Sequence, residues 1–163
     1  MELKMLTIHE SSHDELEQTC HLLNEKWPRP RSARMRWLNE SSASLPISYI
    51  AVLNGDVVGH ARVAPSLKVG GGVDRVNAIV TSVIVDPRKR RMGLGKKLLN
   101  HIEAECRSIY KFGRVVLWTE DQVLFYESCG YIRCRPLSIL SAAASKIEKN
   151  QLHSLESMLV ARK

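Results

Sequence analysis

The pattern of apolar and polar positions in the first third of the chain predicts a strand followed by two helices. Residues 2–8 alternate well enough for a strand, and Ser12 is a suitable N-cap for the segment that follows. That segment repeats apolar residues at helical spacing, at Leu16, Cys20 and Leu23. We expect a second, short helix within residues 30–40.

A hairpin and a central strand are predicted next. The runs ISYIAV and VVGHARV flank Asn54-Gly55-Asp56, a sequence typical of the turn in an antiparallel hairpin. Residues 76–85, VNAIVTSVIV, are long and β-branched, and Pro87 ends this strand because its nitrogen cannot donate to a ladder. The segments 39–46 and 66–74 are interpreted as loops.

Helical periodicity returns at Gly93, and its apolar positions are Leu94, Leu98, Ile102, Cys106 and Ile109. After Gly113 the sequence predicts four more elements. These are a strand at 114–119, a short helix at 120–129, a strand at 130–140 and a last strand at 155–162. The element order is therefore β-α-α-β-β-β-α-β-α-β-β.

Length and composition favour one globular domain over residues 1–163. Apolar residues make up 44% of the 163 residues and charged residues 25%, both ordinary for a soluble domain. There is no run of ~18 apolar residues and no secretory pattern in MELKMLTIHE, so we expect a cytoplasmic protein without a membrane partner. The four cysteines lack metal-site spacing, so we interpret them as free thiols and expect no metal.

The net charge of +7 favours ligands that carry phosphates or carboxylates. A nucleic-acid-binding module is one alternative, because Arg88-Lys89-Arg90-Arg91 is a basic run. Aromatic residues are only 6%, however, and no nucleic-acid-binding motif is present. We therefore expect no nucleic-acid partner.

The segment VIVDPRKRRMGLGKKLL places a buried strand, a basic loop and a glycine-containing first helical turn in succession. Unpaired N–H groups and the positive end of the helix dipole make such a helix start an anion site. It is not a Walker loop, because Arg90 stands where a glycine is required and Lys97 where Ser or Thr would bind magnesium. It is not the dinucleotide fingerprint, because Leu98 occupies the third glycine position.

The motif Arg90-x-x-Gly93-x-Gly95 resembles the pyrophosphate-binding signature of the GCN5-related N-acetyltransferases, the GNAT family. Downstream, Phe125-Tyr126-x-x-x-Gly130-Tyr131 matches a second block of the family, although Thr119 and Gln122 replace its usual Asn and Ala. The resemblance implies an α/β (mixed α+β) fold. Its central, mostly antiparallel twisted sheet would be splayed between the fourth and fifth strands and flanked by about four helices.

The resemblance also implies acetyl-CoA as the co-substrate and a set of site residues. Backbone of the central strand would pair with the pantetheine arm, at Val83, Ile84 and Val85. The loop begins at Arg90, and its backbone would hold the pyrophosphate through Arg91, Met92, Gly93, Leu94, Gly95 and Lys96. Arg88, Lys96 or Lys97 could reach the outer ribose phosphate. Tyr126 would be the general acid that protonates the CoA thiolate.

The general base is less evident, because Thr81 occupies the strand position at which relatives often carry Glu. His60 is a candidate base, although a lone histidine in a strand is more often structural. A weak base suits an α-amine, whose pKa near ~7.7–8.0 leaves on the order of a tenth neutral at pH 7. A lysine with a pKa near ~10.4 is neutral only at the level of a few parts in ten thousand.

The segment 26–39, KWPRPRSARMRWLN, carries five basic residues and no acidic residue to balance them. It resembles the members of the family that acetylate the acidic N-terminus of mature actin. The resemblance implies such an acceptor, bound by Trp27, Arg29, Arg31 and Arg34. Arg31 and Arg34 would share one helix face. A lysine, a polyamine or another small amine is the alternative acceptor, and a solvated basic surface is the alternative role of the segment. We expect a monomer.

Overall fold

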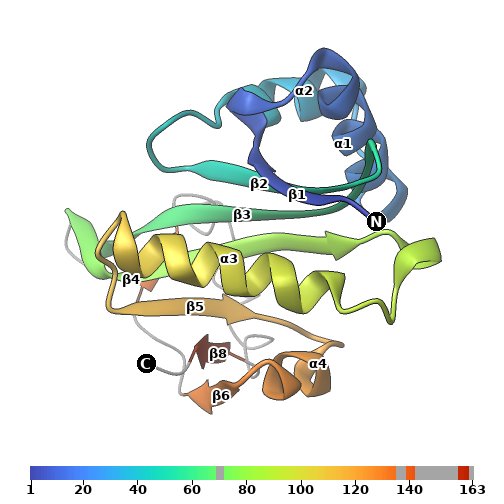
Figure 1. Ribbon diagram of the computed structural model, residues 1–163. Coiled ribbons are helices and arrows are strands. Elements are labelled where there is room, and N and C mark those ends of the chain that lie inside the picture. The colour runs from blue at the N-terminus through green and yellow to red at the C-terminus, as the bar shows by residue number, and fades with distance from the viewer. Residues whose placement is uncertain (69–71, 135–138, 142–157, 162–163) are drawn as a thin grey trace. The chain divides into compact units, whose positions relative to one another are not determined.

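The computed structural model describes residues 1–68, 72–134, 139–141 and 158–161 (Figure 1). The elements, in chain order, are β1 (Leu3–Thr7), η1 (Ile8–Glu10), α1 (His13–Lys26), α2 (Arg31–Asn39), β2 (Ile47–Leu53), β3 (Asp56–Lys68), β4 (Val73–Val85), η2 (Pro87–Lys89), α3 (Leu94–Ser108), β5 (Arg114–Trp118), α4 (Val123–Ser128), β6 (Tyr131–Cys134), β7 (Ile139–Ser141) and β8 (Met158–Ala161). No helix in these ranges is both long and apolar enough to cross a membrane.

The strands follow the order β1-β2-β3-β4-β5-β8-β6, and β7 pairs with β3. Every described register is antiparallel except that of β4 with β5. That parallel pairing runs only from Asn77↔Arg114 to Ile79↔Val116, although β4 continues to Val85 and β5 to Trp118. The predicted fold class is confirmed: a mixed α/β fold with a mostly antiparallel sheet and a parallel pair at its fourth and fifth strands.

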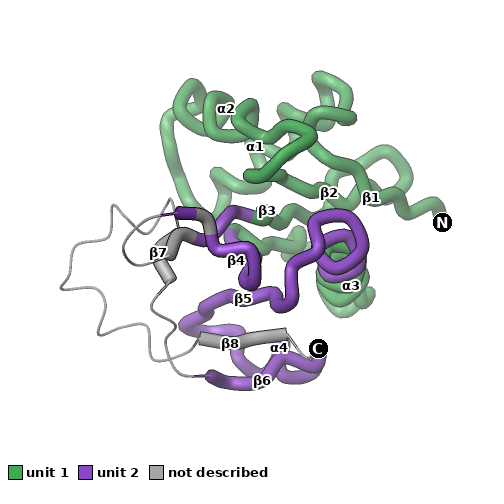
Figure 2. Tube along the Cα trace, turned by 90° about the vertical axis from the view of Figure 1, so that its left-hand side faces the viewer, with its two compact units in different colours: residues 1–63, 82–102 green, residues 64–81, 103–163 purple. Residues whose placement is uncertain are grey.

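The chain forms two compact units, coloured separately in Figure 2. The first comprises residues 1–63 and 82–102, and the second comprises residues 64–81 and 103–163. The prediction of one domain over residues 1–163 stays a prediction, and the two units are described in turn.

In the first unit, helices cover both faces of the sheet. Apolar side chains of α1 and α2 pack on one face, where Leu23 and Leu38 are fully buried against Ile50 of β2 and Ile84 of β4. On the other face Leu94 of α3 packs with Val58 and Val85. Neighbouring residues of β4 point to opposite faces of the sheet. Side chains of α1 and α2 on one face and of α3 on the other therefore cover the last residues of this strand.

The second unit contains the parallel pair and the antiparallel strands that follow it. β8 pairs antiparallel with β5, at Leu117↔Leu159, and with β6, at Cys134↔Met158. Gly113 leads into β5, and its N–H donates to the Val76 carbonyl at 3.0 Å. The short helix α4 immediately precedes β6.

The predicted loop at 66–74 is wrong at both ends, because β3 extends to Lys68 and β4 begins at Val73. Polar side chains satisfy one another there. The Ser66 hydroxyl donates to the Asn77 carbonyl at 3.1 Å, and the buried Asp74 carboxylate accepts from the Asn77 amide at 2.6 Å. The Ser-rich segment 39–46 does contain a connection, between α2 and β2.

The predicted strand at 130–140 is two strands, β6 and β7, and residues 135–138 lie outside the described residues. The predicted strand at 155–162 is described only at Met158–Ala161. The predicted helix at 120–129 is shorter and begins at Val123.

Candidate active site

The basic loop that follows β4 has the backbone of an anion site. Arg91 and Gly93 both adopt left-handed conformations, with φ of 64° and 71°. Left-handed residues close together in a loop turn successive N–H groups toward one side. A Cβ built on Gly93 would meet nothing within 4 Å, so the space beside this residue is open.

α3 begins directly after this loop, at Leu94. The Gly93 carbonyl accepts the first helical hydrogen bond, from Lys97 N–H at 3.0 Å, so the preceding N–H groups lack intrahelical acceptors. The Leu94 side chain is buried in the core, whereas Arg90, Arg91, Met92 and Lys96 are exposed. Leu94 could therefore contribute only its backbone to a ligand.

Arg88, which was expected to reach a phosphate of the ligand, already has a carboxylate partner in the protein. Its guanidinium forms a two-point pair with Asp86, with Nε 2.9 Å from Oδ1 and Nη2 3.1 Å from Oδ2. This pair lowers the pKa of Asp86 below its usual range, because Arg88 donates to the carboxylate. Lys96 and Lys97 are both exposed in the first turn of α3.

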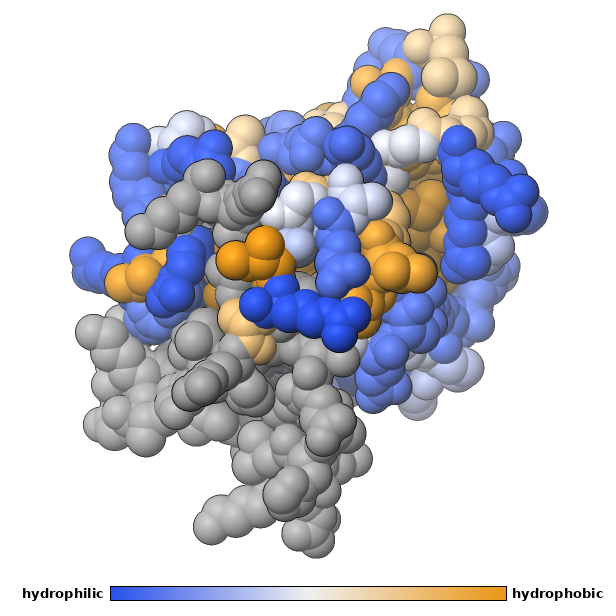
Figure 3. Space-filling model, turned by 90° about the horizontal axis from the view of Figure 1, so that it is seen from below, coloured by the Kyte–Doolittle hydropathy of each residue, from blue (hydrophilic) through white to orange (hydrophobic). Residues whose placement is uncertain are grey.

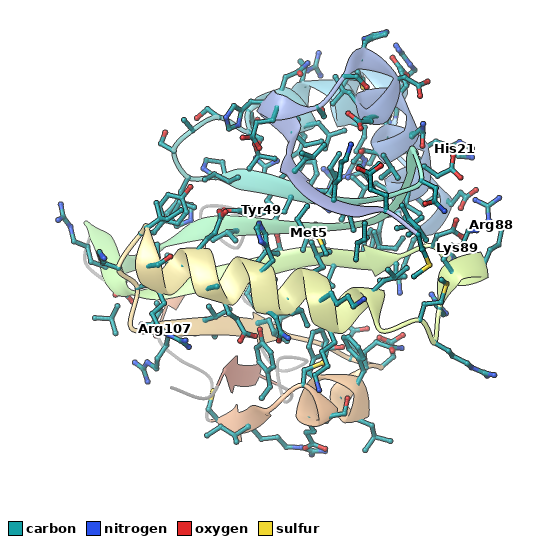
Figure 4. The ribbon with its side chains drawn as sticks, in the orientation of Figure 1. Met5, His21, Tyr49, Arg88, Lys89 and Arg107 are labelled. Carbon is teal, nitrogen blue, oxygen red and sulfur yellow. The ribbon has the colours of Figure 1, made fainter. Side chains whose placement is uncertain are left out.

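Arg88 and Lys89 also line a pocket of about 660 Å³ in the first unit, bounded by α1, the start of β3 and η2. Figure 4 labels both residues together with His21 of α1, which lines the same pocket. Its charged lining is mixed in sign, because Glu17, Glu25, Asp56 and Asp86 also contribute.

The last residues of β4 are fixed by three successive residues of β3. The Asp86 N–H donates to the Val58 carbonyl at 2.8 Å, and Nδ1 of His60 lies 2.9 Å from the Ser82 carbonyl. Between them, a Cβ on Gly59 would lie 3.3 Å from the Ile84 carbonyl. Ser82 itself has φ 53°, a left-handed residue within an extended strand, as at a β-bulge.

The candidate base His60 is fully buried, which leaves an acceptor amine no access to its ring. Burial also lowers its pKa to about 4, with the nearby Arg62 and Arg34 charges acting in the same direction. A group with this pKa is a poor general base near neutral pH. Thr81 is half-buried in β4.

Tyr126 lies in α4 and is buried, at 7% exposure. Its ring packs edge-on against Phe125 at 5.1 Å and Tyr131 at 5.6 Å between centroids. Burial raises its pKa above the usual value, so the hydroxyl keeps its proton throughout the neutral range. Such a group can donate a hydrogen bond or a proton at physiological pH.

The two departures from the family block, Thr119 and Gln122, contact each other. The Thr119 hydroxyl accepts from the Gln122 N–H at 3.0 Å, and the Gln122 carbonyl accepts from the Tyr126 N–H at 3.2 Å. A threonine hydroxyl can form this short turn as Asn does. The substitutions therefore preserve a defined start to the helix that carries Tyr126.

Some basic side chains of segment 26–39 are exposed, and others form contacts within the protein. Arg29 and Arg36 are exposed, and Trp27 is 37% exposed with Lys26 Nζ 5.4 Å from its ring centroid. Arg31 pairs with Glu17 of α1, so the expectation that no carboxylate balances it is wrong. The balancing acid comes from a different helix, which the local sequence does not indicate.

Arg34 differs from the surface residue that the sequence suggests. It is 3% exposed, its Nε donates to Asn24 at 2.9 Å, and its Nη2 donates to the Trp27 carbonyl at 2.5 Å. Arg31 and Arg34 lie on one helix as predicted, but only Arg31 is exposed. The acceptor-binding role of Arg34 stays a prediction, and its described partners all belong to the α1–α2 region.

The sequence did not indicate the contacts of three residues: Trp37, Arg62 and Ser82. The Arg62 guanidinium is buried 4.1 Å from the Trp37 ring centroid, donates to the Trp37 carbonyl at 2.7 Å and pairs with Glu40 at 3.1 Å. Arg34 lies 5.4 Å from the same centroid. The sequence offered one signal, the presence of Arg62 within a predicted strand. A guanidinium that is buried in a sheet requires partners from other elements.

Large hydrophobic side chains are also exposed in the described ranges, and Figure 3 shows hydrophobic patches among hydrophilic residues on the face seen from below. The exposed hydrophobic side chains include Met92 of the loop, at 41% exposure, and Leu124 of α4, at 80%. No group of three or more His, Cys, Asp or Glu residues in the described part of the chain is placed to hold a metal ion.

One curated protein resembles this chain over most of its length. N-alpha-acetyltransferase 80 of Mus musculus is 30% identical over 149 residues, which are 86% of this chain and 45% of that protein. The chain thus spans about half the length of this curated relative.

Solved structures resemble the fold at lower identity. One is a GNAT family N-acetyltransferase (YhbS) from Escherichia coli in complex with CoA, with a TM-score of 0.66 and 16% identity over 98% of this chain and 81% of that chain. Another is N-acetylglutamate synthase from Neisseria gonorrhoeae complexed with coenzyme A and N-acetyl-glutamate, with a TM-score of 0.68 and 15% identity over 99% of this chain and 35% of that chain.

The family model described as "Acetyltransferase (GNAT) family" matches residues 12–131, which include the basic segment, β4, the glycine loop and the Tyr126 block. The chain belongs to the GNAT family of acetyltransferases.

Proposed function

We propose that this protein transfers the acetyl group of acetyl-CoA to the free α-amine of an acidic protein N-terminus, with mature actin as the candidate acceptor. The observation that carries the proposal is the combination of a glycine loop at the start of α3 with three exposed basic side chains of segment 26–39, which are Lys26, Arg29 and Arg36. The former suits a pyrophosphate, and the latter suits acidic residues.

The glycine loop supports acetyl-CoA as the donor. Left-handed Arg91 and Gly93, open space at Gly93 and the start of a 15-residue helix form a backbone cradle for phosphate oxygens. The two solved structures named above contain CoA, and we assign the same ligand to this chain. The backbone of Val83–Val85 would receive its pantetheine arm.

Acetyl transfer to an amine requires a group that protonates the departing CoA thiolate, and we assign this role to Tyr126. The neutral amine attacks the thioester carbonyl, and the C–S bond breaks. The thiolate sulfur takes a proton from Tyr126, and the amine nitrogen releases one proton to water, from which the tyrosinate is reprotonated. The raised pKa of Tyr126 means that its hydroxyl holds a proton at neutral pH.

Two observations favour an α-amine over a lysine. Thr81 offers no carboxylate at the strand position discussed above, and an α-amine requires less help to lose its proton. The curated relative is named as an N-alpha-acetyltransferase. A polyamine is disfavoured by like-charge repulsion from the exposed Lys26, Arg29 and Arg36.

Acetyl transfer to a matched peptide panel tests this proposal. The peptides begin with three Asp, three Glu, three Asn or three Lys residues, each with a free N-terminus, and a further peptide has a blocked N-terminus and an internal lysine. We expect the Asp and Glu peptides to give the highest kcat/KM. Equal rates for the Asn peptides contradict the acidic preference, and acetylation of the blocked peptide supports the lysine alternative. No transfer to any peptide or to spermine contradicts the proposed function.

A further inference from the structure

His60 is a completely buried histidine for which the proposed chemistry has no use. Its ring lies 5.8 Å from the Trp37 ring, and its Nδ1 lies 2.9 Å from the Ser82 carbonyl. Its Nε2 is buried without a hydrogen-bond partner among the described residues. A buried polar atom left without a partner is costly, so the contact at Nδ1 must compensate for it.

The identity of the partner determines the tautomer of the ring. A carbonyl oxygen can only accept, so Nδ1 must carry the hydrogen and donate it to Ser82. In the neutral ring Nε2 is then an unprotonated acceptor. Protonation would add an N–H at Nε2, which has no partner among the described residues, and would place a positive charge near the Arg62 guanidinium; both agree with the pKa of about 4.

The carbonyl that His60 holds belongs to the most unusual backbone position in β4. Ser82 is left-handed at φ 53°, a conformation that costs a non-glycine residue free energy and persists only where surrounding contacts impose it. The His60 hydrogen bond is such a contact. On the far side of the run, the Val58 carbonyl accepts from Asp86 N–H at 2.8 Å, so Val83–Val85 lie between two fixed points.

We propose that His60 is a positioning residue: its Nδ1–H holds the Ser82 kink and thereby sets the direction of the Val83–Val85 backbone that binds the acetyl-CoA arm. The inference rests on the proposed acetyl-CoA site. It assigns His60 no contact with substrate. Gly59 serves the same run, because its lack of a side chain lets β3 approach the Ile84 carbonyl.

Substitutions that separate the two ring nitrogens test this role. In His60→Asn the side-chain amide nitrogen can take the place of Nδ1, whereas in His60→Gln the amide reaches toward the place of Nε2. His60→Leu removes both. We expect calorimetric titration with acetyl-CoA to show affinity within about threefold of wild type for His60→Asn. The Gln and Leu variants should bind at least tenfold more weakly and show a raised KM for acetyl-CoA with little change in kcat.

Ile47→Ala is the matched control for damage to the core, because Ile47 is also fully buried in the same sheet. It should lower the unfolding temperature and leave acetyl-CoA affinity unchanged. If His60→Leu does not fold, Gly59→Ala provides a second variant, since its methyl group would press on the Ile84 carbonyl and is expected to weaken acetyl-CoA binding. Wild-type affinity in folded His60→Leu or in Gly59→Ala overturns the inference.

Nitrogen NMR of histidine-labelled protein tests the hydrogen bond itself without any ligand. We expect His60 to be protonated at Nδ1 only, with no titration between pH 6 and 8. A midpoint near pH 6.5, or a proton on Nε2, overturns the inference. If the wild-type protein binds no acetyl-CoA but His60 shows the expected tautomer, the proposed function fails while the assigned hydrogen bond stands, so the two failures are distinguishable.

Discussion

Arg34 donates a hydrogen bond from Nη2 to the backbone carbonyl of Trp27, at 2.5 Å. This contact joins the C-terminal end of α1 to the buried side of α2. Arg34 is thus buried beneath the surface, whereas Arg29 and Arg36 of the same basic segment are exposed. The two kinds of arginine should therefore respond differently to substitution.

We expect Arg34→Ala to lower the free energy of unfolding by about 1–3 kcal/mol, because the Trp27 carbonyl and the Asn24 side chain lose a buried donor. Arg29→Ala should leave it unchanged and lower kcat/KM for an Asp-initiated peptide about fivefold, the scale of one exposed charge pair. Urea unfolding and peptide kinetics of both variants provide the measurements. Wild-type stability in Arg34→Ala would contradict its structural role.

The left-handed glycine of the loop allows a matched test of acetyl-CoA binding. Gly93→Ala introduces strain at φ 71°, and Gly55→Ala introduces the same kind of strain at φ 93° in the β2–β3 turn. Neither new methyl group meets an atom within 4 Å. Both variants should lose about 1 kcal/mol of stability, but only Gly93→Ala should bind acetyl-CoA about tenfold more weakly in calorimetry. Equal binding in the two variants would remove the loop from the site.

For Tyr126→Phe we expect kcat to fall by about 10²–10⁴, with unchanged acetyl-CoA affinity, because a positioned general acid is lost. Tyr131→Phe is the control, since Tyr131 is also buried and packs against Tyr126. The raised pKa of Tyr126 further predicts that its ionisation does not limit the rate below about pH 10. Full turnover in a folded Tyr126→Phe protein would reassign Tyr126 to packing.

His60 should make stability depend on pH. Its folded pKa of about 4 lies below the ordinary 6.5, so the unfolded chain binds more protons in this window. The contribution of His60 to the free energy of unfolding is thus fully present above about pH 6.5 and is lost as pH falls toward 4, with a total effect of about 3 kcal/mol. Urea unfolding at pH 7.0 and 4.5 should show a smaller difference for His60→Asn than for wild type. An unchanged difference would mean that His60 titrates normally.

Acetylation of an Asp-initiated peptide should slow as salt rises from about 50 to 300 mM, because ions screen exposed charges. The rate with an Asn-initiated peptide should change little, which makes this peptide the control. Equal salt dependence for both peptides would indicate that Arg29 and Arg36 do not meet acceptor carboxylates.

Local sequence signals predicted much of the fold because they depend on neighbouring residues. Ser12 caps α1 and forms a capping box with Glu15, and Asn54-Gly55 forms the hairpin turn with positive φ at both residues. The glycine loop likewise lies where the strand-to-helix pattern placed it. Each of these signals is complete within a few residues.

Interactions between distant residues were not predictable in this way. The spacing of Arg31 and Arg34 predicts a shared helix face, but only the packing of α2 determines which arginine becomes buried. Serine is not a residue type that demands a left-handed backbone, and the His60 ring that contacts the Ser82 carbonyl comes from 22 positions away. Strain of this kind is imposed by tertiary contacts.

The contacts of Trp37 predict that local unfolding of α2 is slow. Two guanidinium groups lie over its ring, and its carbonyl accepts from Arg62 of β3. Unwinding α2 alone would leave these buried charges without their contacts, so local unfolding of the helix carries a high free-energy cost. Its amide hydrogens should exchange with solvent as slowly as those of β2 and β3. An acceptor peptide would then meet a surface that is already ordered, and its binding would cost little conformational entropy on the side of the enzyme.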